Sequence, residues 1–105
     1  MTRVTLFRGP EGELTGFSCK GHSGYGEEGG DIVCAAVSAL SITCVNALQS
    51  VAGVTPDVAE KDGFLTARLR ADQMNHDAQV ILRTFEQGIG DMAASYPKYI
   101  SFTAR

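Results

Sequence analysis

His22 and Cys34 are the two residues whose types and spacing point to nucleophilic chemistry. They flank "SGYGEEGGDIV", a stretch rich in glycine and carboxylates that leads into an uncharged apolar run. A thiol attacks only as its thiolate, and a neighbouring imidazole can take the thiol proton and stabilise the charge that results. The pair therefore predicts a Cys–His dyad in which Cys34 is the nucleophile and His22 is the base.

Asp31 and Ser38 are the residues expected to support this pair. Asp31 is a good N-cap for a helix that begins at Ile32, which would place Cys34 in the first turn. There the unpaired backbone N–H groups and the helix dipole favour a negative charge. Ser38 lies one helical turn after Cys34, and Ser41 lies on the same face, so hydroxyl groups are expected beside the thiol.

The other two cysteines and the other histidine have simpler interpretations. Cys19 shares an inward strand face with Phe17, and Cys44 lies in the apolar run, so both are expected to be buried as small hydrophobic residues. The same interpretation stays open for Cys34, although its place at a helix start after a His favours chemistry. His76 is expected to be a solvated residue at a helix start. Three cysteines without a CxxC pair argue against a disulfide framework and fit a reducing cytosol.

A metal site is the alternative for the same side chains. Cys34 and Cys44 are separated by about 15 Å of helix rise, which excludes a single zinc bound by Cys19, His22, Cys34 and Cys44 together. A zinc bound by Cys19, His22 and Cys34 remains open only if Cys19 faces the helix. The glycines of the loop do not follow the phosphate-loop pattern, and the carboxylates there would repel phosphate. We expect neither a metal nor a cofactor.

Two hairpins and two helices are needed to position these residues. Alternating patterns and turn residues predict strands over residues 3–8 and 13–20, then over 56–61 and 64–70, the second pair joined by Asp62-Gly63. A helix is expected over residues 32–51, with Gly53 placed to end it. A second helix is capped by Asn75 and stopped by Pro97, and a strand follows over residues 99–105.

The predicted order is ββαββαβ, in one α+β domain spanning residues 1–105 with two helices packed on an antiparallel or mixed sheet. The first helix carries no charge and is apolar nearly all round, so it is expected to be covered on more than one side. Burial between layers of the domain, or in a homodimer, would achieve this.

The composition limits the partners. The formal net charge is −3, which predicts no basic face for nucleic acid. The first residues, "MTRVTLFRGPEG", lack the apolar segment of a secretory signal, and the uncharged stretch over residues 32–56 contains enough Ser, Thr, Asn and Gln to disfavour a membrane span. A cytoplasmic protein without a membrane partner is expected.

The segment "GHSGYGEEGGDIVCAAVSAL", supported by "NHDAQVILRTF", resembles the ribosomal-processing cysteine protease family over the full length of the chain. The resemblance implies a cytoplasmic, homodimeric endopeptidase that uses a Cys–His dyad. The implied reaction removes a short N-terminal extension from the large-subunit ribosomal protein numbered twenty-seven. On this sequence the nucleophile falls on Cys34, the base on His22, and Asp31 and Ser38 match flanking motif positions.

A different class of function stays open from the residues alone. The chain would then be a non-catalytic dimer, for ribosome assembly or scaffolding, with inert cysteines and with the uncharged helix as its interface. The two hypotheses differ in whether Cys34 is reactive.

Overall fold

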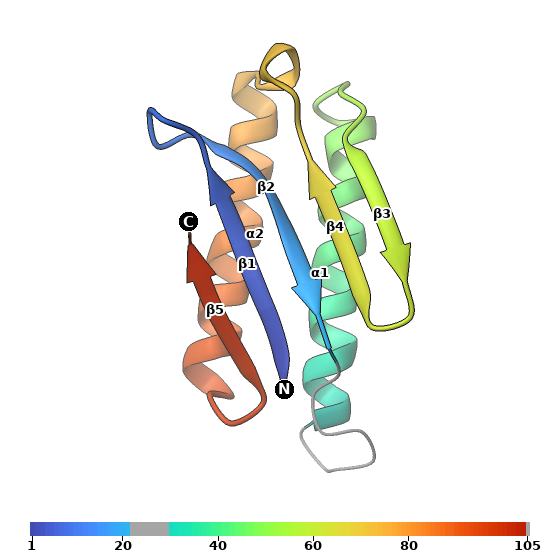
Figure 1. The fold of residues 1–105 in the computed structure, drawn as a ribbon, viewed down its shortest axis with the longest axis vertical. Helices are drawn as coiled ribbons and strands as arrows, with labels where there is room; N and C mark the ends of the chain where they lie inside the picture. The colour runs from blue at the N-terminus through green and yellow to red at the C-terminus, as the bar shows by residue number, and fades with distance from the viewer. Residues whose placement is uncertain (22–29, 105) are drawn as a thin grey trace.

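The computed structural model describes residues 1–21 and 30–104, which form a five-stranded sheet with two helices on one of its faces (Figure 1). The elements are β1 (Thr2–Arg8), β2 (Leu14–Lys20), α1 (Gly30–Ser50), β3 (Asp57–Lys61), β4 (Phe64–Arg68), α2 (His76–Ser95) and β5 (Ile100–Ala104). A short 3₁₀ turn, η1 (Ala71–Gln73), precedes α2. This order confirms the predicted ββαββαβ α+β fold.

The sheet is mixed, with the strand order β3-β4-β2-β1-β5. All neighbouring strands are antiparallel except β1 and β5, which are parallel because α2 intervenes between β4 and β5 and returns the chain along the sheet. Both predicted hairpins are present. Gly63 has φ of 72° in the turn between β3 and β4, a conformation that favours glycine.

The core lies between the sheet and the helices. Val4, Leu6 and Phe17 point inward from the central strands and are at most 1% exposed. The ring of Phe17 stacks on that of Phe85 from α2, with 4.2 Å between ring centroids. Phe85 and Ile89 are both buried and lie four residues apart, which is the spacing of side chains on one face of a helix.

Helix α2 begins where the sequence predicts. The Asn75 side chain accepts a hydrogen bond from the Ala78 N–H at 2.8 Å, which confirms Asn75 as the N-cap. His76 is exposed, as expected for a helix-start residue. Further along, a Cβ on Gly88 would lie 3.1 Å from a Leu40 methyl group, so this glycine lets α1 and α2 approach closely.

The start of α1 differs from the prediction. The helix begins at Gly30, so Asp31 is its second residue rather than its N-cap, and Cys34 is the fifth residue rather than part of the first turn. A carboxylate is favourable anywhere in the first turn because it interacts with the helix dipole there. The presence of Asp31 therefore marks the helix start without fixing its first residue.

The hydropathy of α1 differs from the expectation that its Ser, Thr, Asn and Gln residues disfavour a membrane span. By length and hydropathy alone, Ile32–Ser50 is apolar enough to cross a membrane, and 28% of that window is buried in this fold. In the structure one side of α1 packs on α2 and the sheet (Figure 1). Ile32 and Ile42 remain more than half exposed, so an uncharged surface is left outside the core.

Candidate active site

A cavity of about 650 Å³ lies between α1 and the end of the sheet where β2 finishes and the β3–β4 hairpin turns. Three parts of the chain line it: the sheet through Thr2, Cys19 and Gly21, helix α1 through Cys34, Val37, Ser38, Ser41 and Ile42, and the hairpin through residues 60–65. Strand β4 starts where antiparallel β2 ends, since Phe64 pairs with Lys20. This register brings the hairpin turn beside the start of α1.

Cys34 faces this cavity from α1 and is partly exposed, whereas Cys19 and Cys44 are buried. None of the three cysteines belongs to a disulfide bond. Cys34 lies one turn inside the helix, close to the helix start, where the first N–H groups have no intrahelical partner. A nucleophile at this place is open to a peptide in the cavity and close to donors that can bind a negative oxygen.

Cys19 forms the floor of the cavity and is held as a protonated thiol. The Ser41 hydroxyl donates its single hydrogen to the Val37 carbonyl at 2.7 Å. The hydrogen bond between Cys19 and Ser41, 3.3 Å from Sγ to Oγ, must therefore be donated by the thiol. Burial raises the pKa of Cys19, and the hydrogen bond that the thiol donates also favours its neutral form.

The position of Cys19 bears on the three-ligand zinc alternative. Cys19 does face α1, which is the condition on which that alternative depended. A zinc-bound sulfur must be a thiolate, however, and both the direction of the hydrogen bond and the raised pKa favour the neutral thiol. Among the residues that the structure describes, no group of three or more His, Cys, Asp and Glu side chains is arranged to hold a metal ion.

Cys44 is a core residue, as predicted. It is 4% exposed, and burial, with a smaller contribution from Cys19, raises its pKa to about 12. Cys19 and Cys44 are thus both buried, as predicted, and Cys34 is the cysteine that lines the cavity without being buried in the core.

Gly21 connects the sheet to the segment that carries His22. Its N–H donates to the Gly63 carbonyl at 2.7 Å, and its φ is 87°. A Cβ at this position would lie 2.8 Å from the Met1 carbonyl oxygen, so a side chain does not fit. The chain therefore leaves the sheet at the cavity rim. His22 itself, the predicted base, lies outside the described residues.

The other predicted residues have mixed outcomes. Ser38 lines the cavity and is exposed, and Ser41 lines it but is buried with its hydroxyl engaged. Asp31 lies in the first turn of α1. The contribution of the β3–β4 hairpin to the cavity, including Glu60 and Leu65, was not predicted, because nothing in the sequence indicated that β4 pairs with β2.

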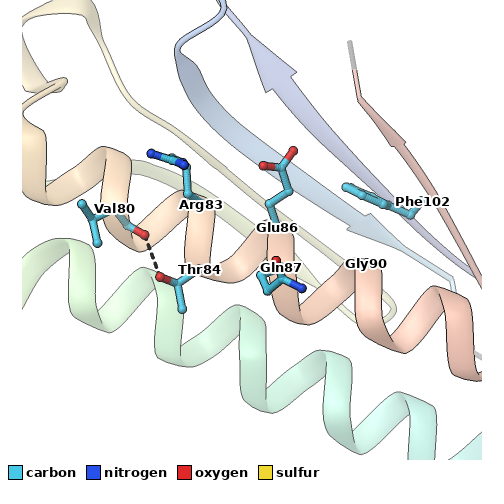
Figure 2. A pocket seen from close by; sticks show the side chains of 7 residues that line it. All are labelled: Val80, Arg83, Thr84, Glu86, Gln87, Gly90 and Phe102. Carbon is cyan, nitrogen blue, oxygen red and sulfur yellow. Dashed lines mark hydrogen bonds between the residues drawn. The ribbon is translucent and has the colours of Figure 1, made fainter.

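A second cavity of about 640 Å³ lies on the outer side of α2 against β5 (Figure 2). Its lining residues are Val80, Arg83, Thr84, Glu86, Gln87, Gly90 and Phe102. The Thr84 hydroxyl donates to the Val80 carbonyl at 2.8 Å, so this hydroxyl is occupied within its own helix. This lining contains neither a thiol nor an imidazole, so the cavity beside Cys34 is the candidate active site.

Comparisons with known proteins agree with this choice. A family model described as "Cysteine protease Prp" matches residues 1–101. The chain is 33% identical over 101 residues, 95% of both chains, to the ribosomal processing cysteine protease Prp of Staphylococcus aureus. It is 30% identical over 103 residues to the protein of the same name from Bacillus subtilis, covering 87% of this chain and 92% of the relative.

A solved structure extends the similarity to three dimensions. The S. aureus protease, described as an essential ribosomal processing protease in complex with a covalently linked product peptide, superposes with a TM-score of 0.90 at 32% identity. The alignment covers 100% of both chains.

Proposed function

Because this chain belongs to the cysteine protease Prp family, and is therefore a cysteine protease, we propose that it is an endopeptidase that processes a ribosomal protein precursor. The proposed reaction removes a short N-terminal extension from the large-subunit ribosomal protein numbered twenty-seven. The name of the S. aureus relative and its structures with a substrate peptide and a covalently linked product peptide support a peptide as the substrate class.

The partial exposure of Cys34 in a 650 Å³ cavity is the observation that carries this proposal. A peptide has to bring a backbone carbonyl to the nucleophile while its side chains find space nearby. The cavity offers apolar surface from Ile42 and Leu65 and polar groups from Ser38 and Glu60. A catalytic thiol also distinguishes this function from the inert scaffold considered above.

In the proposed mechanism Cys34 and His22 form a dyad. The Cys34 sulfur attacks the scissile carbonyl carbon while His22 takes the thiol proton. His22 then returns that proton to the leaving amine as the peptide bond breaks, which leaves a thioester on Cys34. Water, deprotonated by His22, hydrolyses the thioester. The position of Gly21 on the cavity rim supports this role for His22, because His22 is the next residue.

The first turn of α1 is proposed to stabilise the tetrahedral intermediate. The first N–H groups of a helix lack intrahelical partners, and in α1 they belong to the turn that precedes Cys34. Donors placed where an oxyanion forms contribute strongly to acyl transfer. Asp31 belongs to this turn and Ser38 to the cavity wall, so both are proposed as supporting residues. The dyad requires neither a metal nor a cofactor.

We further propose that the protein is a cytoplasmic homodimer without a membrane partner. Its three cysteines are not joined in disulfides, which fits a reducing compartment. Residues 32–50 of α1 carry no charge, and the exposed side chains there include Ile32 at 56% and Ile42 at 53%. Such a surface is suited to a second copy. Sedimentation equilibrium should give twice the mass of the chain, and a monomer at micromolar concentration would contradict the dimer.

Incubation with a synthetic peptide that spans the precursor extension tests the proposed function. Mass spectrometry should find two products from a single cleavage, and prior treatment with iodoacetamide should abolish cleavage while adding label to Cys34. Cleavage that survives complete labelling of Cys34 would contradict the mechanism. Cleavage of unrelated peptides at equal rates would contradict the substrate while leaving the mechanism intact.

A further inference from the structure

The face of the sheet opposite the helices is not covered by either helix (Figure 1). Side chains alternate along strands, and Val4, Cys19 and Ala67 point toward the helices, so their neighbours in sequence point the other way. We call this the open sheet face. Its charged residues on the described strands are Arg3, Lys20, Lys61, Arg68 and Asp57.

Four of these five residues are cations, and all four are exposed. We call Arg3, Lys20, Lys61 and Arg68 the sheet cations. Within residues 1–21 and 30–104, none of them forms a salt bridge. Asp57 is the single carboxylate among the five, and it lies directly across from Arg68 and 3.9 Å from Arg70. The open sheet face is therefore positive although the whole chain has a net charge of −3.

The sheet cations are close to one another across the strands. Lys20 pairs directly with Arg3, and Lys61 lies in the same row, separated from Lys20 by Phe64. Strands lie about 4.8 Å apart, so this row spans about 14 Å. Like charges directly opposite each other destabilise a sheet. A bound anion would remove that repulsion.

Two aromatic rings lie among the cations. Arg68 places its guanidinium carbon 3.9 Å from the centre of the Phe7 ring, and Lys20 Nζ lies 5.7 Å from the centre of the Phe64 ring. Gly16 separates Arg68 from Phe7 in the same row, and a Cβ there would lie 2.2 Å from the Ala67 carbonyl oxygen. The missing side chain leaves room for Arg68 to lie flat above the ring.

Residues with hydroxyl groups lie in the row between the one that contains Lys20 and the one that contains Arg68. Thr66, Ser18 and Thr5 are aligned across β4, β2 and β1. The Thr66 hydroxyl donates to the Phe17 carbonyl at 3.1 Å, which leaves its oxygen to accept. The open sheet face thus combines cations for phosphate, a guanidinium plane for stacking, and the partly exposed hydroxyl groups of Thr5 and Thr66.

We infer that the open sheet face binds single-stranded RNA. Cations across adjacent strands suit a flexible phosphate backbone, and unpaired bases can stack on an arginine plane or an aromatic ring. An acidic peptide would satisfy the charges but would leave the stacking surface unused. This inference is independent of the proposed cleavage. It differs from the expectation that a net charge of −3 leaves no basic face for nucleic acid, because the net charge does not say where the charged residues lie.

Fluorescence anisotropy with a labelled, mixed-sequence RNA of about 12 nucleotides tests the inference. With three to four phosphate contacts, affinity should fall roughly 20- to 50-fold between about 50 and 200 mM salt. The double variant Arg3→Gln/Lys20→Gln should bind about 10-fold or more weakly at the lower salt concentration, with a shallower salt dependence. Circular dichroism would establish that this variant is folded.

The matched control is Arg83→Gln/Lys98→Gln, which removes the same charge from exposed positions outside the sheet strands. It should bind RNA like the unmodified protein. Equal loss in both double variants would overturn the inference, as would an absence of RNA binding at the lower salt concentration. Equal affinity for a glutamate-rich peptide of the same length would assign the face to acidic proteins instead.

Discussion

The Cys19 thiol donates a hydrogen bond to the Ser41 hydroxyl across 3.3 Å, and this contact joins the sheet to α1 directly beneath the cavity that Cys34 lines. Both partners are buried, at 8% and 2% exposed. The Ser41 hydroxyl itself donates a hydrogen bond to the Val37 carbonyl within the helix. The helix that carries the nucleophile is therefore fixed to the sheet by a polar contact that does not itself take part in the chemistry.

Replacing Ser41 with alanine should destabilise the protein, because the Cys19 S–H would lose its acceptor in the core. The expected loss is about 0.5 to 1.5 kcal/mol in the free energy of unfolding, measured by urea denaturation. Ser38→Ala is the matched control on the same helix, since Ser38 is exposed, and it should change stability by less than about 0.5 kcal/mol. Equal stability of both variants would contradict the role given to Ser41.

Ser38→Ala should instead affect cleavage. Ser38 lines the cavity one turn after Cys34, where its hydroxyl can donate to or accept from a bound peptide. Losing one such hydrogen bond costs about 0.5 to 1.5 kcal/mol, which corresponds to a decrease of roughly 2- to 10-fold in kcat/KM for the precursor peptide. A loss as large as that of Cys34→Ala would show that Ser38 takes part in the reaction itself.

Stability should decrease above pH 9 because of Cys44. Its ordinary pKa is 9.0 and burial raises it to about 12 in the folded protein. Between these values the unfolded chain has lost the proton that the folded chain retains, so the free energy of unfolding falls as pH rises. The contribution is at most about 1.4 kcal/mol per pH unit.

Urea denaturation at pH 8, 9 and 10 checks this dependence. Other groups also titrate in this range, so the comparison is between the unmodified protein and Cys44→Ala. The variant should be less stable at pH 8, because it leaves a cavity, and should lose less stability per pH unit above 9. Parallel pH profiles would mean that the Cys44 thiol is not held neutral in the core.

Gly88 and Gly90 provide a paired test of helix packing. A Cβ on Gly88 would lie 3.1 Å from Leu40, whereas nothing lies within 4 Å of one on Gly90. Gly88→Leu should destabilise by about 1 to 3 kcal/mol through overpacking, and Gly90→Ala should stabilise by about 0.5 to 1 kcal/mol through helix propensity. Thermal denaturation distinguishes the two, and a stabilising Gly88→Leu would contradict the close α1–α2 contact.

The strands and helices were largely predictable because their signals are local. The Asp62-Gly63 turn and the Asn75 cap act within a few residues, and both appear where the sequence indicates. The start of α1 was misplaced, since Asp31 suits several positions of a first turn. The sequence predicted the part of the cavity that α1 lines, but not the part that the β3–β4 hairpin lines. Cys34 and Ser38 share a helical face, but the contribution of Glu60 and Leu65 depends on the pairing of β4 with β2, which links distant parts of the chain.

Cleavage of the precursor peptide by Cys34→Ala is the most direct test of the central claim. The substitution removes one sulfur from a partly exposed position, so the fold should persist by circular dichroism while cleavage disappears. His22→Ala should have the same effect, and Cys19→Ala and Cys44→Ala should retain near-normal rates once shown to be folded. Cleavage by folded Cys34→Ala at a rate close to that of the unmodified protein would contradict the account.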